Sequence, residues 1–239
     1  MKTVCYIHGL FGSSADWDGY TKTPGSFAID LSHYDAPHLD LDALCTQIGA
    51  DWDLRGISSL SLVGYSMGGR IALMLLHRFP ERIEKLIAIG ATFSIEPQNL
   101  MQRLFFQLNW EMRFACWPLS TFFYHWYAQP LFRGFNYKDH QKKRESIPIA
   151  FHAKCFNRLH VLHQPDFKEL LIPYQNRILL LCGEHDPSCL NHYKTLGSMG
   201  YAIKEIANAG HAVFLEQPQA TLTEITRFIY GKCLSAPPI

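Results

Sequence analysis

Short apolar runs alternate with longer stretches of helical periodicity along most of this chain. Short apolar runs bounded by Gly, Asp or Ser are typical of strands buried in a parallel sheet, and the periodic stretches between them supply the crossover helices. We therefore predict an α/β domain with a mostly parallel sheet and helices on both faces. The predicted strands are residues 4–8, 27–30, 57–63, 86–90, 178–182 and 202–206, and the predicted helices include 39–52, 69–79 and 220–230, the last ending at Gly231.

The pattern changes between residues 94 and 165, where aromatic side chains become frequent and prolines interrupt the helical periodicity. This change predicts a helical cap, 94–165, inserted between two segments of one core domain, 1–93 and 166–239. The aromatic side chains have an ordinary explanation, since they would pack the cap onto the core. A membrane-surface helix is disfavoured because the charges do not gather on one polar face. The aromatic residues are Phe105, Phe106, Trp110, Phe114, Trp117, Phe122, Phe123, Trp126, Tyr127, Phe132 and Phe135.

The composition narrows the classes of function. The chain has 239 residues, 48% of them apolar, which suits one large domain, and its formal charge of +1 disfavours nucleic acid or an anionic membrane as a partner. No run approaches the ~20 apolar residues that span a bilayer, so we expect no stable membrane insertion. The seven cysteines form no C-x-x-C pair, so a reduced, cytoplasmic setting fits best. Neither a metal-ligand spacing nor a glycine-rich phosphate loop is present, and we expect no metal or cofactor and a monomer or weak homo-oligomer.

The sequence Gly64-Tyr65-Ser66-Met67-Gly68 lies between a predicted buried strand and a predicted helix. A serine with a glycine two residues away on each side suits a tight strand-to-helix turn, because a Cβ at either glycine would crowd the neighbouring backbone. Such a turn holds the serine in a strained conformation with its hydroxyl above the sheet. The motif therefore predicts a reactive serine at Ser66.

A serine hydroxyl needs an imidazole to take its proton and a carboxylate to orient that imidazole. In a triad built on this kind of turn the chain order is serine, acid, histidine, and Asp186 and His211 follow Ser66 in that order. Glu184 is the competing acid, two residues earlier, and His185 is the competing base. We favour Asp186 from its Gly-Glu-x-Asp pattern, and His211 because the histidine is expected on a separate loop.

Negative charge that develops on a substrate oxygen needs preorganised N–H donors. The residue after the reactive serine supplies one donor, which here is the backbone N–H of Met67. The second donor is expected from the loop after the first predicted strand, His8-Gly9-Leu10-Phe11-Gly12, with the N–H of Leu10. The plainer interpretation of His8-Gly9 is a turn that ends a strand.

At these residues the chain resembles the α/β-hydrolase superfamily along nearly its whole length. A narrower set of motifs is similar to the 2-succinyl-6-hydroxy-2,4-cyclohexadiene-1-carboxylate (SHCHC) synthases of menaquinone biosynthesis. The most telling of these motifs is residues 126–132, because it lies in the predicted cap, where unrelated α/β-hydrolases diverge most. The motifs are Gly64-Tyr65-Ser66-Met67-Gly68-Gly69-Arg70, Trp126-Tyr127-Ala128-Gln129-Pro130-Leu131-Phe132, Gln164-Pro165-Asp166-Phe167 and Cys182-Gly183-Glu184-His185-Asp186.

The resemblance implies a carbon–oxygen lyase that eliminates pyruvate from 2-succinyl-5-enolpyruvyl-6-hydroxy-3-cyclohexene-1-carboxylate, with the triad acting mainly as a base and without an acyl-enzyme. That substrate carries three carboxylates, and arginine pairs with a carboxylate through a bidentate fork. For any single arginine the ordinary alternative is a solvated surface salt bridge. The substrate-binding residues that the resemblance implies are Tyr65, Arg70, Arg103, Trp126 and Arg144.

The chain also departs from the family that it resembles. It starts almost at the His-Gly strand, so we expect an N-terminally shortened sheet that lacks the usual one or two first edge strands. The usual Asp-x-Pro-Gly-His-Gly-x-Ser after the next strand is replaced by Asp-Leu-Ser-His-Tyr-Asp-Ala-Pro at residues 30–37, and this loop beside the site must take another path. We therefore weigh the lyase against a serine esterase or thioesterase with the same triad, and against a catalytically silent binding protein, which an intact triad disfavours.

Overall fold

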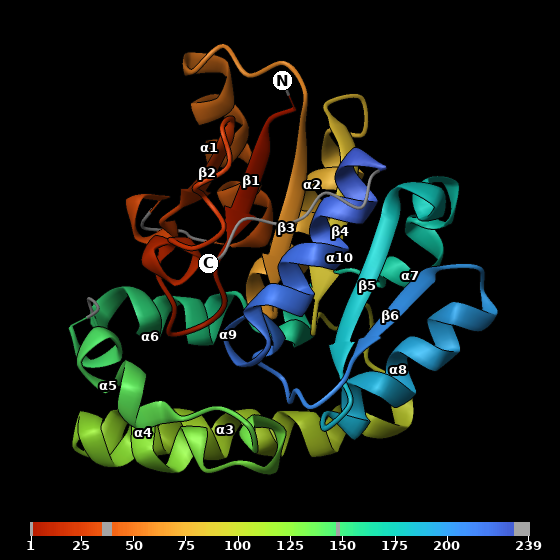
Figure 1. The fold of residues 1–239 in the computed structure, drawn as a ribbon. Helices are drawn as coiled ribbons and strands as arrows, with labels where there is room; N and C mark the ends of the chain where they lie inside the picture. Colours follow the sequence, from red (N-terminus) through yellow and green to blue (C-terminus); the bar gives the residue numbers. More distant parts are fainter. Residues whose placement is uncertain (1, 35–39, 147–148, 232–239) are drawn as a thin grey trace.

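A six-stranded parallel sheet forms the centre of the computed structural model, which describes residues 2–34, 40–146 and 149–231 (Figure 1). The strands lie in the order β2-β1-β3-β4-β5-β6, with β2 at one edge beside β1. The predicted α/β-hydrolase fold, with helices on both faces of the sheet and a helical insertion, is confirmed. The strands are β1 Val4–Ile7, β2 Ser26–Ile29, β3 Leu60–Tyr65, β4 Ile83–Ile89, β5 Ile178–Gly183 and β6 Ala202–Ile206.

Successive side chains of each strand enter opposite layers of the core. In β1, Cys5 and Ile7 join the apolar cluster on one face of the sheet, whereas Val4 and Tyr6 join the cluster on the other face. Because both faces are covered by helices, the central strands are apolar at nearly every position. This is why short continuous apolar runs, rather than alternating ones, predict these strands.

Both faces of the sheet are covered by helices that the chain places between its strands. On one face Trp17 stacks on Phe214 with ring centroids 4.1 Å apart, which joins the N-terminal and C-terminal parts of the chain. The other face carries the larger cluster, which the helix after the Ser66 turn enters. The first face is covered by η1 Ser14–Trp17, α9 Val213–Glu216 and α10 Pro218–Tyr230, and the second by α1 Leu41–Leu54, α2 Met67–Arg78 and α8 Pro187–Ser198, with η2 Leu31–Tyr34 preceding α1.

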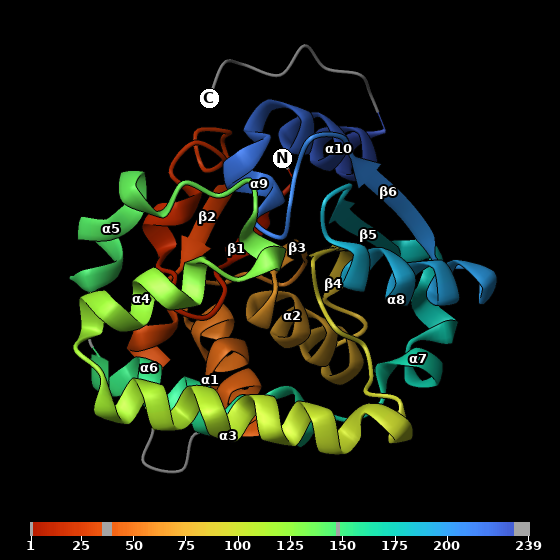
Figure 2. The ribbon, with the colours of Figure 1, turned by 90° about the horizontal axis from the view of Figure 1, so that it is seen from below.

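The chain between β4 and β5 forms the helical insertion, which lies across the carboxyl ends of the strands (Figure 1). Seen from below, α3, α4, α5 and α6 lie in front of the sheet (Figure 2). The limits 94 and 165 for a separate cap stay a prediction. The elements are η3 Pro97–Asn99, α3 Leu100–Cys116, α4 Leu119–Tyr127, η4 Pro130–Phe132, α5 Tyr137–Glu145, α6 Ile149–Arg158 and η5 Val161–His163, followed by α7 Phe167–Leu170 and η6 Ile172–Arg177.

Aromatic side chains join the insertion to the core, as their ordinary explanation requires. Phe11, from the loop after β1, is fully buried, and its ring lies 5.2 Å from Phe123 and 5.3 Å from Trp126 between ring centroids. Most of the predicted aromatic residues belong to this cluster or to a smaller one around Phe132. Phe105 differs, since 64% of it is exposed on the outer side of α3.

The observed element bounds differ from the predicted ones by a few residues. β3 begins at Leu60 rather than at residue 57 and runs on to Tyr65, and β4 begins at Ile83 rather than at residue 86. Apolar patterning reports burial, whereas a strand begins where ladder hydrogen bonding begins, so the two can disagree at the ends. β6 has the predicted bounds.

The C-terminal helix ends as predicted, because Gly231 takes the left-handed conformation with φ 68° after α10. The predicted helix start at residue 39 and residues 35–37 of the altered loop lie outside the described residues, and so does Pro148, one of the prolines that interrupt the helical pattern of the predicted cap. Among the residues that the structure describes, no helix is long and apolar enough to cross a membrane.

Candidate active site

The turn between β3 and α2 has the strained geometry that its glycines predict. Ser66 adopts φ 52° and ψ −110°, a region that residues with a side chain rarely occupy. A Cβ at Gly64 would collide with the backbone of Gly68, and a Cβ at Gly68 would collide with the carbonyl oxygen of Ile7. Glycine at both positions therefore lets α2 start close against β1 and β3, which sets the Ser66 hydroxyl at the carboxyl edge of the sheet.

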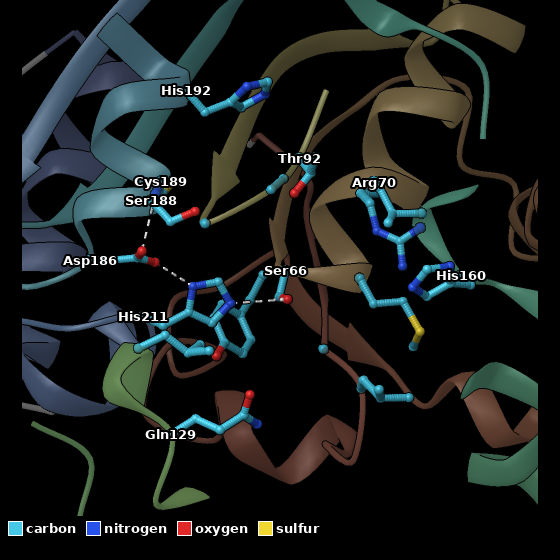
Figure 3. A pocket seen from close by; sticks show the side chains of 18 of the residues that line it. Ser66, Arg70, Thr92, Gln129, His160, Asp186, Ser188, Cys189, His192 and His211 are labelled. Atoms are coloured by element: carbon cyan, nitrogen blue, oxygen red, sulfur yellow. Dashed lines mark hydrogen bonds and ion pairs between the residues drawn. The ribbon is translucent and has the colours of Figure 1, made fainter. Parts of the chain in front are cut away.

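Ser66, His211 and Asp186 form one hydrogen-bonded chain (Figure 3). The Ser66 hydroxyl lies 3.2 Å from Nε2 of His211, and Nδ1 of His211 lies 2.7 Å from Oδ2 of Asp186. In the tautomer that suits a base, Nδ1–H donates to the carboxylate and Nε2 accepts from the hydroxyl. The structure therefore brings together the three residues that the chain order predicts.

Asp186 is fixed by its place at the start of α8. It is the N-cap residue, and its Oδ1 accepts a hydrogen bond of 3.0 Å from the N–H of Cys189. Burial alone would raise the pKa of Asp186, but the hydrogen bond and charge of His211, together with the Cys189 N–H, outweigh it and hold the pKa below its ordinary value. The carboxylate is therefore ionised, as the orienting member of a triad must be.

The loop that carries His211 is held by hydrogen bonds to the cap and to the side chain of Glu216. The N–H of His211 donates to the carbonyl of Leu131 at 2.9 Å, and Glu216 accepts from the N–H groups of Gly210 and Ala212 at 2.7 and 3.0 Å. These bonds fix the imidazole from the cap side as well as from the core side. We infer that displacement of the cap would disturb the position of the imidazole.

The competing acid and base do not reach Ser66. Glu184 is exposed and accepts from the N–H of Asn208 at 2.9 Å, while His185 is exposed and lies 3.9 Å from Glu184. Geometry therefore selects Asp186 over Glu184 and His211 over His185.

The loop after β1 has the geometry of a fixed turn beside Ser66. The ring of His8 donates from Nδ1 to the carbonyl of Gly9 at 2.9 Å and accepts from the N–H of Leu31 at 3.0 Å, and Phe11 takes a positive φ of 59°. Leu10 and Met67 both border the same cavity as Ser66. Their backbone N–H groups thus stay our predicted donors to an oxyanion, and their placement is compatible with that role.

A cavity of about 960 Å³ lies between the carboxyl edge of the sheet and the cap. It is large enough for a cyclic substrate with two side arms. The cavity is lined by Ser66 and His211 and also by every residue that the resemblance implies for substrate binding, which are Tyr65, Arg70, Arg103, Trp126 and Arg144.

Two of these arginines have no carboxylate partner among the described residues. Arg70 donates to the carbonyl of Leu159 at 2.6 Å and to Oε1 of Gln164 at 3.1 Å, both neutral acceptors. Burial, with a smaller effect of Arg103, lowers the pKa of Arg70 to about 9. Arg103 is exposed on α3, and its guanidinium carbon lies 5.2 Å from the centroid of the Phe106 ring. This end of the cavity is therefore positively charged and able to receive an anion.

Arg144, which the resemblance implies for substrate binding, is paired with an acid of this chain. It lies in the cavity wall, but only 4% of it is exposed, and its guanidinium lies 2.6 Å from Oδ2 of Asp16. Asp16 also lies 3.2 Å from Nζ of Lys143, so two cations of α5 surround it. Because Asp16 compensates the charge of Arg144, the pair joins the cap to the loop after β1 rather than leaving a third free arginine.

Sequence reasoning missed Asp16. The available signal was Ser13-x-x-Asp16, a pattern of helix starts, and the structure has that capping box at η1. The pattern indicates a structural acid, but it does not indicate that the acid is buried against the cap.

Tyr65 and Trp126 lie in the cavity wall as aromatic surfaces. The ring of Tyr65 lies 5.3 Å from the His211 ring, and Trp126 lies 5.0 Å from Trp110. Neither residue carries a charge at neutral pH, so each shapes the cavity rather than neutralising a substrate carboxylate. Among the described residues, no group of three or more His, Cys, Asp or Glu side chains is arranged to hold a metal ion.

Comparison with known proteins agrees with this geometry. The model of the "Alpha/beta hydrolase family" matches residues 6–224. The curated "2-succinyl-6-hydroxy-2,4-cyclohexadiene-1-carboxylate synthase" of Serratia proteamaculans is 27% identical over 95% of this chain and 92% of its own length. The enzyme of the same name from Escherichia coli O1:K1 is also 27% identical, over 95% of both chains.

Solved structures show the same fold at lower identity. MenH from S. aureus superposes with a TM-score of 0.82 at 21% identity, covering 96% of this chain and 94% of its own. A carboxylesterase from Nitrososphaera gargenis superposes with a TM-score of 0.78 at 14% identity, covering 95% and 89%. At these identities the likeness bears on the fold alone.

Proposed function

We propose that this chain, which belongs to the alpha/beta hydrolase family, is a lyase that eliminates pyruvate from a cyclohexene carboxylate carrying an enolpyruvyl ether and a succinyl arm. The product is SHCHC, and the substrate is a small polycarboxylate. The main support is the combination in one cavity of the Ser66–His211–Asp186 chain with two arginines, Arg70 and Arg103, that have no carboxylate partner in the described part of the chain. The curated relatives named for this reaction, at 27% identity, give independent support.

In the proposed mechanism Ser66 is a base rather than a nucleophile. His211 takes the hydroxyl proton through Nε2, and Ser66 Oγ takes a proton from a ring carbon beside the succinyl carbonyl. The electron pair of that C–H bond passes into an enolate, whose oxygen the N–H groups of Leu10 and Met67 would receive. The electrons then return through the ring, the ring carbon–oxygen bond breaks, and enolpyruvate leaves with the bonding pair and takes up a proton to become pyruvate.

Arg70 and Arg103 have a defined task in this reaction. Arg70 and Arg103 would neutralise substrate carboxylates, which holds the ring over Ser66 and lowers the cost of forming an enolate beside existing negative charge. Asp186 keeps His211 in the tautomer that accepts a proton at Nε2. No covalent intermediate on Ser66 is needed.

The second candidate is a serine esterase or thioesterase, which the same hydrogen-bonded chain would also suit. There Ser66 attacks a carbonyl, an acyl-enzyme forms, and water releases it. Intact-mass analysis of protein quenched during turnover of the enolpyruvyl precursor separates the two mechanisms. The lyase leaves the chain at its unmodified mass, and an adduct that disappears in Ser66→Ala contradicts the role of Ser66 as a base.

Replacing Arg103 with glutamine is expected to weaken use of the anionic substrate. We expect kcat/KM for pyruvate release to fall about 10- to 100-fold, mainly through KM, because a charged partner for a carboxylate is lost. Arg113→Gln on the same helix is the matched control, since Arg113 stacks on Trp110 and Trp117 outside the cavity. Equal kinetics in Arg103→Gln and wild type contradict the assignment of Arg103 to substrate binding.

A further inference from the structure

His160 occupies the charged end of the cavity, where sequence reasoning assigned it no role. It follows α6 as the N-cap residue of η5, and the cavity is lined by His160 together with Arg70 and Arg103. Figure 3 draws its ring at the same end of the cavity as Arg70, away from the Ser66–His211–Asp186 chain. Only 8% of His160 is exposed, so its ring faces cavity and protein rather than bulk water.

The hydrogen bonding of His160 fixes which nitrogen carries the proton. The N–H of Leu162 donates to Nδ1 of His160 at 3.3 Å, so Nδ1 is an acceptor and Nε2 bears the hydrogen. Nε2 is buried and has no hydrogen-bond partner among the described residues. A buried N–H donor without an acceptor costs free energy, which a ligand oxygen at this position would recover.

The charge of this ring supports a neutral donor. Burial, followed by the positive charges of Arg103 and Arg70, lowers the pKa of His160 to about 3. The ring is therefore uncharged at neutral pH, and it adds a directed N–H to the two guanidinium groups without adding a third repelling cation.

We propose that Arg70, Arg103 and His160 form a subsite for one carboxylate of the substrate, in which His160 donates Nε2–H to a carboxylate oxygen and the arginines supply the charge. A carboxylate has lone pairs for several donors at once, which suits this set. The chemical class of ligand is an aliphatic carboxylate arm, which in the proposed substrate is the succinyl arm. The inference rests on the proposed function only where it identifies this arm as the succinyl arm.

Two substitutions of His160 separate ligand binding from the structural role of the ring. In His160→Asn the amide oxygen stands near the place of Nδ1, so the bond from Leu162 is kept while the donor into the cavity is lost. In His160→Gln the longer side chain returns an N–H donor near the place of Nε2, while the bond from Leu162 is lost. His163→Asn is the matched control, because His163 is exposed on the same short helix and lies outside the cavity lining.

Succinate binding to the full chain, measured by isothermal titration calorimetry, tests the subsite without turnover. We expect His160→Asn to weaken binding about tenfold, the equivalent of one hydrogen bond to a charged group. His160→Gln and His163→Asn should stay within about threefold of wild type, and succinamide, which has the same length but no charge, should not compete.

The opposite ranking, with His160→Asn unchanged and His160→Gln impaired, means that the ring only caps η5 and overturns the proposal. If both variants bind succinate as tightly as wild type, the proposal is overturned, since a water molecule then suffices as the partner of Nε2–H. If both variants lose the same affinity, the proposal is overturned as well. A wild-type protein that takes up no succinate contradicts the subsite itself. Pyruvate release is a separate readout, so failure of the lyase function and failure of this subsite are distinguishable.

Discussion

Replacing Ser66 with alanine is expected to lower kcat/KM for pyruvate release by at least about 10³-fold, because the group that removes the proton from carbon is lost. Alanine tolerates φ 52° about as well as serine, and the hydroxyl of Ser66 donates to His211, whereas its backbone N–H donates to the carbonyl of Ile89 in either variant. The midpoint of thermal unfolding should therefore stay close to that of wild type, so that lost activity is not lost folding.

The control for this variant is Ser198→Ala, since Ser198 is exposed and its hydroxyl donates to the carbonyl of Thr195 on the same helix. Steady-state assays of pyruvate release compare the two. If Ser66→Ala keeps activity within about tenfold of wild type, His211 or water takes the proton directly, and the proposed role of Ser66 is wrong.

Replacing Arg144 with methionine is expected to lower the free energy of unfolding at pH 7 by about 3–5 kcal/mol. The change leaves Asp16 buried with Lys143 as its remaining cation, and only 7% of Asp16 is exposed. Lys143→Met is the comparison, since Lys143 is partly exposed and its loss should cost about 0–1 kcal/mol. Denaturant titration followed by tryptophan fluorescence measures both.

The pH dependence of the Arg144→Met deficit gives a second check. Burial would raise the pKa of Asp16, but Arg144, with a smaller contribution from Lys143, holds it below its ordinary value in the wild-type protein. The stabilisation that Asp16 provides is therefore present above the ordinary pKa of 3.8 and is lost as the pH falls through its lowered value. The deficit of Arg144→Met should be largest at neutral pH and shrink on acidification.

A double variant tests whether the missing partner causes the deficit. Asp16→Asn combined with Arg144→Met removes both charges, and it should recover most of the stability lost in Arg144→Met. If Arg144→Met lowers the free energy of unfolding by less than about 1 kcal/mol, or by an amount that does not change with pH, Arg144 and Asp16 are not a buried ion pair that joins the cap to the core. It would return Arg144 to the role of a free substrate-binding cation.

The Ser66 turn and its partners could be predicted because their constraints are local or follow from chain order. The crowding at Gly64 and Gly68 comes from the turn itself. Asp186 follows β5, whose apolar pattern is plain, and His211 follows β6, whose pattern is weaker and alternating. In a parallel sheet the carboxyl ends of strands meet at one edge, so residues just after different strands converge there.

The partner of Arg144 could not be predicted in this way. Asp16 lies 128 residues away in the chain, on a short helix that packs against the core, and nothing local to either residue indicates the other. Whether an arginine has a carboxylate partner depends on such contacts. The resemblance implies three substrate-binding arginines, and in the structure two of them have no carboxylate partner among the described residues.

His160 shows a further limit. A histidine after a helix has no distinguishing pattern, and its donor is defined only by the Leu162 N–H that occupies the other ring nitrogen. The orphaned Nε2 is a property of the folded cavity. The burial of the His160 ring and its Nε2–H tautomer indicate a ligand contact, whereas the residue type alone does not.

Pyruvate release by the purified protein tests whether this serine turn serves an elimination. The enolpyruvyl cyclohexene carboxylate and a panel of p-nitrophenyl esters are offered separately, and kcat/KM is measured for each. We expect pyruvate release with kcat/KM of ~10⁴ M⁻¹s⁻¹ or above and only trace ester hydrolysis. Robust ester hydrolysis without pyruvate from the precursor would contradict the elimination.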